Sequence, residues 1–267
     1  MTAAIPDQLL LLGLLLKIVM TVTIVVAATI VVERSGPFIG ALIAALPTAA
    51  GAVYIILALE HQPAFIAQSA VGSMAANASV TLFAFTYALL AQRRGLLVSL
   101  AGAFAVWFVC AGLLRLVNWT PASAIVLNVI VIGAAIIASR RFRVESAKQR
   151  VKATPADIAW RAAIVALCVV VVTTASHSIG SFASGVFAVF PVAMGSFFLI
   201  LHPRVGGPAA ASVAAHIPAP LFGLALGFVA VHYLAESIGV WWSYAAGLAI
   251  GIAWNALICL IRRRRDF

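Results

Sequence analysis

Charge is scarce in this sequence, and acidic charge is the scarcer kind. Only 9% of the 267 residues are charged, and Asp and Glu together contribute seven of them. All seven lie at the ends of apolar runs or in the connections between them: Asp7, Glu33, Glu60, Glu145, Asp157, Glu236 and Asp266. A proton relay of carboxylates buried at membrane depth is therefore not expected. Glu33 and Glu60, at run ends, are candidate gate residues.

Cysteine and catalytic motifs are also sparse. Cys110, Cys168 and Cys259 fall inside apolar runs at unrelated spacings, which excludes a disulfide framework and favours buried packing. The chain has no phosphate-binding glycine loop, no nucleophile elbow and no zinc-protease helix motif. No pair of histidines has metal-ligand spacing with a third ligand nearby. We therefore expect no catalytic residues, no metal site, no cofactor and no enzymatic activity.

Apolar residues are abundant instead, at 64% of the chain. Apolar stretches of about 20 residues recur along the whole sequence, and each is long enough to cross a bilayer as a helix. The sequence predicts an all-α, polytopic transmembrane helix bundle with about nine spans. The expected spans are 9–32, 37–59, 64–90, 96–116, 121–139, 158–178, 181–201, 208–234 and 239–260. Membrane lipids are the expected surroundings, and homo-oligomerisation is left open.

The net charge of +10 reflects membrane orientation rather than nucleic-acid binding, because the basic residues sit in short clusters between and after the apolar runs. With the N-terminus outside, the cytoplasmic segments hold 14 of the 17 Lys and Arg residues. They are Arg34, Arg93, Arg94, Arg140, Arg141, Arg143, Lys148, Arg150, Lys152, Arg204 and Arg262 to Arg265. Only Arg115 falls on the outer side. This bias predicts a multi-pass protein of the inner (plasma) membrane with its C-terminus in the cytoplasm.

Two segments share the pattern G-x-F-x8-P-x3-G at an offset of 144 residues. The matched positions are Gly36 and Gly180, Phe38 and Phe182, Pro47 and Pro191, and Gly51 and Gly195. The same offset places Lys17 on Arg161, and the helix beginning near 94 on the one beginning near 238. An internal duplication accounts for this agreement. We expect a four-helix repeat over 1–117, a linker helix and basic cytoplasmic loop over 118–156, and a second four-helix repeat over 157–267.

An odd number of crossings separates the two expected units. Four spans return the chain to its starting side and the linker helix carries it across, so the second unit would be inverted relative to the first. Inverted repeats with interrupted helices are a recurring plan of secondary transporters, whose substrate sites lie near the membrane midplane. Pro47 and Pro191 each fall midway along a span, where proline removes a helical hydrogen bond. They mark such a site, or they only kink two helices for packing.

Polar side chains near these prolines are candidates for a solute pathway. Ser69, Ser73 and Asn77 follow one another at i, i+4 and i+8, with Gln68 beside them, and form one polar stripe on an apolar helix. In the eighth span, Ser212 and His216 share a face. The expected pathway residues are Lys17, Pro47, Gly51, Ser69, Ser73, Asn77, Pro191, Gly195 and His216. Interhelical hydrogen bonding without a ligand is the other interpretation of the polar stripe.

Lys17 admits two interpretations. An ammonium about 12 Å inside the membrane would favour an anionic solute. If the span starts nearer residue 13, the same side chain can extend to the outer surface.

The first two spans, "LLLKIVMTVTIVVAATIVV" and "SGPFIGALIAALPTAAGAVYIILALEHQPAF", resemble a family of uncharacterised bacterial inner-membrane proteins. Their duplicated unit carries G-x-x-x-G-x-L-x4-P-x3-G, and the short GlpM-like proteins are similar to one such unit. The matching positions are Gly36, Pro37, Gly40, Pro47, Gly51, Gly180, Pro191 and Gly195. The second unit departs from the pattern at Ser181 and Ser184. The resemblance implies a membrane location but no activity.

The sequence favours a secondary transporter or exporter of a small polar or anionic solute, working by alternating access. The alternative is a non-transporting membrane factor, either a lipid-handling protein or a scaffold for an envelope enzyme. The basic loop 140–152 suits such a docking role as well as it suits an orientation signal.

Overall fold

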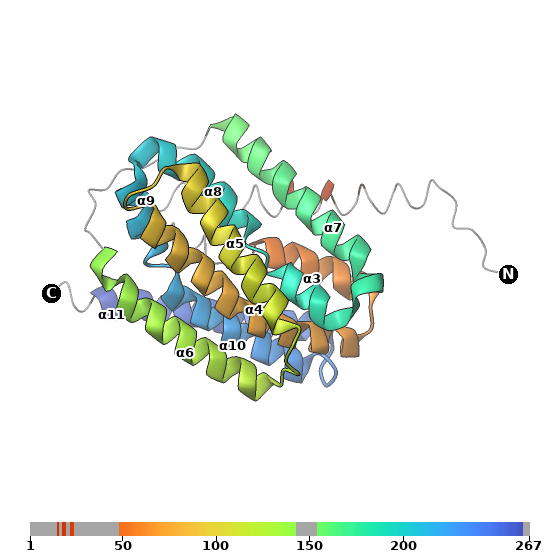
Figure 1. The fold of residues 1–267 in the computed structure, drawn as a ribbon. Coiled ribbons are helices and arrows are strands. Elements are labelled where there is room, and N and C mark those ends of the chain that lie inside the picture. The colour runs from red at the N-terminus through yellow and green to blue at the C-terminus, as the bar shows by residue number, and fades with distance from the viewer. Residues whose placement is uncertain (1–14, 16–17, 20–21, 24–47, 143–153, 264–267) are drawn as a thin grey trace.

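The computed structural model describes residues 15, 18–19, 22–23, 48–142 and 154–263. The regular structure of these residues is helical. In order, the elements are α3 (Thr48–Glu60), α4 (Pro63–Leu90), α5 (Leu96–Leu114), α6 (Pro121–Ser139), η1 (Arg140–Phe142), α7 (Pro155–Ala188), α8 (Val192–Val205), α9 (Gly207–Ala214), α10 (Pro218–Leu234) and α11 (Val240–Arg263). Helix α4 lies at the centre and packs against α5, α6, α7, α9 and α10 (Figure 1).

Proline and capping side chains set where several helices begin. Pro63, Pro121 and Pro155 each occupy the first turn of a helix, where the missing N–H costs no hydrogen bond. Thr120 and Thr154 cap α6 and α7 through reciprocal capping boxes. The start of α7 is thus set by Thr154 as cap and by Pro155 at the first helical position.

Six helical segments of the described chain are long and apolar enough to cross a membrane, by length and composition. They are Pro63–Leu90, Leu96–Leu114, Pro121–Phe142, Pro155–Val205, Gly207–Leu234 and Val240–Ile261. The expected spans 64–90, 96–116, 121–139 and 239–260 agree with α4, α5, α6 and α11. The first expected span lies largely outside the described residues, and the second is described only from residue 48.

The expected continuous helix over 181–201 is wrong. Helix α7 bends at Gly180, whose φ of 80° suits glycine, and its second segment ends at Ala188. The chain then leaves the helical path at Val189 and Pro191, and α8 begins at Val192. Proline supplies no N–H to continue the preceding helix, so Pro191 marks a full break rather than a kink.

The expected helix over 208–234 is also interrupted, at residues 215–217 between α9 and α10. Pro218 and Pro220 follow immediately, and each lacks the N–H that would bond to a carbonyl of the turn before it. The matched stretch of α4 carries Met74 and Ala76 in place of these prolines, and α4 runs through without a break.

Helix boundaries recur at the same offset of 144 residues as the sequence pattern. Two starts and one end agree: Pro63 with Gly207, Leu96 with Val240, and Leu90 with Leu234. This agreement extends the matched pattern beyond the proline segments. It covers the third and fourth helices of each expected unit.

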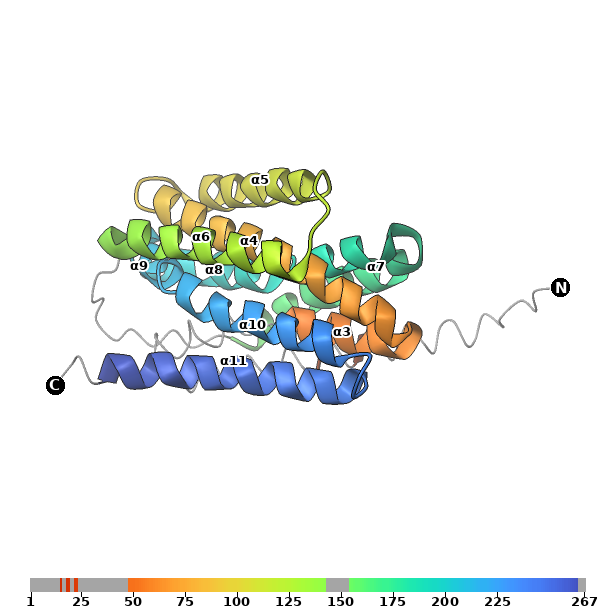
Figure 2. The same cartoon turned by 90° about the horizontal axis from the view of Figure 1, so that it is seen from below.

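Helices α4 and α10 run antiparallel. The Nδ1 of His232 donates to the carbonyl oxygen of Ala67 at 2.9 Å, and the Nδ2 of Asn77 donates to that of Leu221 at 3.0 Å. Residue numbers along α10 thus decrease as those along α4 increase, so the two helices run in opposite directions. Figure 2 shows the consequence: the turn from α4 to α5 and the turn from α10 to α11 lie at opposite ends of the bundle.

The distribution of polarity is that of a membrane-embedded protein. The central helix α4 buries serine, threonine and asparagine, whereas large apolar side chains are exposed on the outer helices. Exposed examples are Leu97, Val109, Leu116, Ile130, Ile137, Leu167, Trp242 and Leu260. Water would not tolerate so large an apolar surface, but lipid chains do.

Candidate functional site

The predicted polar stripe lies at the centre of the bundle. Ser69, Ser73 and Asn77 are fully buried on α4, each with 0% of its surface exposed. Gln68, which was expected beside them, is exposed, and this expectation is wrong. It lies outside the stripe because one residue turns the side chain by about 100° around the helix.

Ser73 joins three helices through its hydroxyl. Its Oγ donates to the carbonyl oxygen of Gly185 at 2.7 Å and lies 2.7 Å from the hydroxyl of Tyr54. A serine hydroxyl has one proton, so Tyr54 is the donor in the second bond. The hydroxyl of Tyr244 donates in turn to the backbone oxygen of Tyr54 at 2.9 Å. Helices α3, α4, α7 and α11 thus share one chain of hydrogen bonds.

Asn77 joins three helices through its amide. Its Nδ2 donates to Asn128 Oδ1 on α6 at 2.8 Å and to the carbonyl oxygen of Leu221 on α10 at 3.0 Å. Because a carbonyl only accepts, the nitrogen of Asn77 has to face Leu221, and this fixes the amide orientation. Asn128 Nδ2 donates to the carbonyl oxygens of Met74 and Ala124 at 2.7 and 2.8 Å. Both amide hydrogens of Asn128 and its amide oxygen are therefore bonded to other groups of the protein.

Two polar atoms of the stripe have no hydrogen-bond partner in the described part of the chain. They are the Oδ1 of Asn77 and the Oγ of Ser69, and both are buried. A buried polar atom left without a partner costs about 1–3 kcal/mol. The stripe therefore offers one amide acceptor and one hydroxyl to a group that reaches it.

The hydrogen-bond partners of the stripe lie about one helical turn from the two helix breaks. Gly185, the partner of Ser73, precedes the break at 189–191 by four residues, and Leu221, the partner of Asn77, follows the break at 215–217 by four residues. His216 lies inside the second break rather than on a continuous helix, and its Nδ1 donates to the backbone oxygen of Ser212 at 2.7 Å. Pro191 is the residue before α8.

Neither Gly51 nor Gly195 has the backbone of another helix against it in the described part of the chain. A Cβ on Gly51 would have no neighbour within 4 Å among the described residues, and one on Gly195 would meet the ring of Phe104 at 2.6 Å. The close backbone approach occurs instead between Gly72 on α4 and Gly185 on α7. A Cβ on either one would lie 2.1 Å or less from a backbone oxygen of the other helix.

Lys17 and Pro47 lie outside the described residues. Arg161, the position matched to Lys17, is only 5% exposed, and its Nε has no hydrogen-bond partner among the described residues. It lies one turn after Asp157, which pairs with Arg204 of α8. The neighbouring Trp160, by contrast, has 56% of its surface exposed.

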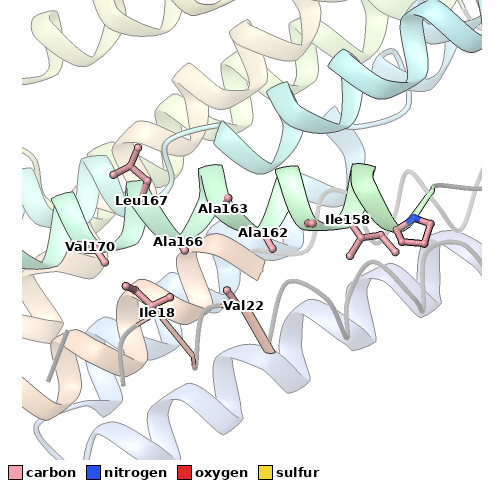
Figure 3. Close-up of a pocket in the computed structure, with 10 residues that line it drawn as sticks. Ile18, Val22, Ile158, Ala162, Ala163, Ala166, Leu167 and Val170 are labelled. Atoms are coloured by element: carbon pink, nitrogen blue, oxygen red, sulfur yellow. The ribbon is translucent and has the colours of Figure 1, made fainter. Parts of the chain in front are cut away.

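Two cavities flank α7. The described residues that line the larger, about 770 Å³, are all apolar (Figure 3): Ile18, Val22, Pro155, Ile158, Ala159, Ala162, Ala163, Ala166, Leu167 and Val170. None of these residues offers a side-chain group for recognising a polar solute. The smaller, about 160 Å³, lies between α5 and the second segment of α7, and Arg115 is the charged residue among those that line it.

Tyr54 and Asn128 were not anticipated as members of the polar network. Tyr54 lies seven residues after Pro47, and Asn128 is the one strongly polar side chain in the middle of the expected linker helix. A lone amide inside an apolar span is a signal for an interhelical partner, and that signal was available in the sequence.

Comparison of the chain with protein-family models, with curated proteins and with solved structures finds no match. The resemblance to a GlpM-like unit therefore stays a prediction, and the function has to be argued from the geometry of this chain.

Proposed function

We propose that this membrane-embedded protein is a secondary transporter or exporter that moves a small polar or anionic solute by alternating access. The observation that carries the proposal is that the buried α4 stripe bonds to Gly185 and Leu221, each about one helical turn from a helix break. Interrupted helices expose backbone donors and acceptors, and at membrane depth these are tolerated only against protein or a water-lined cavity. Transporters use this combination to bind solutes.

An inverted duplication supports the same proposal. Helix α4 and the matched α10 run antiparallel, as two units related by an axis in the membrane plane would require. The shared helix boundaries at an offset of 144 agree with this symmetry. In the proposed orientation the N-terminus is outside, and the basic segments face the cytoplasm of a bacterial cell. The mechanism includes no catalytic step.

A preference for anions rests on three features of the described chain. The guanidinium of Arg161 is buried with its Nε unpartnered, and Arg115 lines the small cavity beside the second segment of α7. Helix α8 also begins inside a span, at Val192, and helix N-termini carry partial positive charge. An anion is therefore the solute that the charges of this bundle stabilise best.

Alternating access makes a prediction that does not require the solute. Ser73 is sealed in this arrangement, so a transporter has to open a path to it from each side in turn. In a background without the native cysteines, Ser73→Cys is expected to react slowly with a small, charged thiol reagent. The reaction should occur both in intact cells and in inside-out vesicles.

Ala75→Cys is the matched control, because Ala75 is equally buried but lies on another face of α4. It should stay unlabelled from both sides. Labelling of neither cysteine would contradict alternating access through the stripe, and equal labelling of both would indicate general unfolding instead.

The large cavity favours one other candidate, a lipid-handling membrane factor. Its apolar lining and its volume of about 770 Å³ suit an acyl chain (Figure 3). This candidate requires no access to the stripe, so it predicts that Ser73→Cys stays unlabelled from both sides. The same experiment therefore separates the two functions.

A further inference from the structure

Three side chains with metal-binding atoms meet where α3, α4 and α7 come together. Glu60 ends α3, His61 follows it, and His177 lies three residues before the bend at Gly180. One ligand atom from each lies within 4.8 Å of those of the other two. No metal site was expected from the sequence, in which 116 residues separate His61 from His177.

The hydrogen bonds of His61 and Ser176 determine which nitrogen of His61 carries the proton. Ser176 Oγ donates its single proton to the carbonyl oxygen of Thr173 at 2.7 Å. Ser176 Oγ therefore accepts the bond from His61 Nε2, which is 2.8 Å away, and Nε2 carries the proton. In a neutral imidazole the lone pair is then on Nδ1, the form in which histidine binds a metal.

The ring of His61 is also fixed in orientation. It stacks on Phe65 with ring centroids 3.7 Å apart and planes inclined by 5°, and its centroid lies 4.5 Å from that of His177. Ser176 also holds the ring, through its hydrogen bond with Nε2. A partner that orients a metal-binding histidine through its second nitrogen is a regular feature of metal sites.

We propose that Glu60, His61 and His177 bind a divalent zinc-type ion, with two imidazole nitrogens, one carboxylate oxygen and water as the fourth ligand. Imidazole favours zinc and similar transition metals over Ca²⁺ and Mg²⁺, which prefer oxygen ligands. A tetrahedral zinc ion with bonds of about 2.0–2.1 Å holds its ligand atoms about 3.3 Å apart. Binding would close the set from 4.8 Å through rotation of the side chains of Glu60 and the exposed His177.

The site goes beyond the proposed transport function and uses other residues than the polar stripe. It would link the α3–α4 corner to α7 beside the bend at Gly180, where the backbone φ is 80°. A bound ion would therefore restrain α7 against α3. In the proposed orientation this corner faces outward, where external zinc can reach it.

Cobalt is the probe that tests the site. The full-length protein, purified in detergent with any affinity tag removed, is titrated with Co²⁺ and then with Zn²⁺. We expect one Co²⁺ per chain, with the strong visible bands of four-coordinate cobalt and their loss on addition of zinc. Because the three cysteines are free, a variant without them serves as the starting protein.

Variants assign the ligands. His61→Gln, His177→Gln and Glu60→Gln should each weaken binding by about 100-fold, and Ser176→Ala by about 10-fold. His202→Gln is the control, because His202 bonds to Tyr87 away from this cluster, and it should bind as the parent does. The absence of four-coordinate bands, or their retention in His177→Gln, would overturn the proposal. Neither result depends on transport or on labelling of Ser73→Cys.

Discussion

Replacing Gly185 by alanine is expected to destabilise the protein by about 3 kcal/mol, because the new methyl group has no room. Its carbon would lie 1.8 Å from the carbonyl oxygen of Ser69 and 3.0 Å from the Cα of the same residue. Both atoms belong to the backbone of α4, so no side-chain rotation relieves the contact. Gly72→Ala should act similarly, since its methyl carbon would lie 2.1 Å from the carbonyl oxygen of Phe182.

The measurement is the thermal unfolding of the purified variants in detergent. Gly133→Ala is the matched control, because a Cβ at that position in α6 has no neighbour within 4 Å. It should keep or raise the unfolding temperature, since alanine favours a helix over glycine. Equal unfolding temperatures for Gly185→Ala and Gly133→Ala would mean that α4 and α7 do not approach as closely as described.

Replacing Asn128 by leucine is expected to cost about 2 kcal/mol, because one buried partner of Asn77 is removed. Asn77 Nδ2 would keep only the carbonyl oxygen of Leu221, and the carbonyl oxygen of Met74 would lose a donor from α6. The double variant Asn77→Leu/Asn128→Leu should be more stable than the sum of the two single effects predicts. The two amides contact each other, and removing both leaves fewer unpaired groups.

Asn118→Leu makes the same chemical change at an exposed position in the turn before α6, and it should leave stability nearly unchanged. Denaturation in detergent compares the four variants with the parent. Strict additivity of the two core substitutions would contradict the hydrogen bond between Asn77 and Asn128.

Local signals in the sequence were sufficient for most helix boundaries. Proline in the first turn and a capping threonine place the start of α7 without reference to tertiary structure. The polar stripe of Ser69, Ser73 and Asn77 followed from helical periodicity alone, and all three are buried as that pattern predicted. These features depend on neighbours a few residues apart, which is why sequence reasoning reaches them.

The two helix breaks could not be predicted from neighbouring residues in the sequence alone. Pro191 predicted a kink, but the chain leaves the helix for residues 189–191. Pro218 and Pro220 were equally visible, yet the gap at 215–217 was not predicted. A proline in the sequence indicates only that one helical hydrogen bond is missing. Whether the helix then bends or stops depends on neighbouring helices.

Contacts between segments that are distant in the sequence could not be predicted from it. Glu60 and His61 meet His177 only because α3 and α7 pack together, and no spacing rule relates positions so far apart. Likewise, Gly72 and Gly185 carry no mark that distinguishes them from Gly51 and Gly195, which lack a close backbone neighbour in the described chain. Pairing of this kind follows from the tertiary arrangement.

The central claim is that two units of opposite orientation face each other across the bundle, and a pair of cysteines tests it most directly. Arg93 and Ser237 are exposed, are separated by the offset of 144, and follow α4 and α10. In a background lacking Cys110, Cys168 and Cys259, each is replaced by cysteine and treated with a membrane-impermeant maleimide in intact cells. Inverted units predict labelling of Ser237→Cys but not of Arg93→Cys until the membrane is opened. Labelling of both from the outside would place the matched turns on one side and contradict the inverted arrangement.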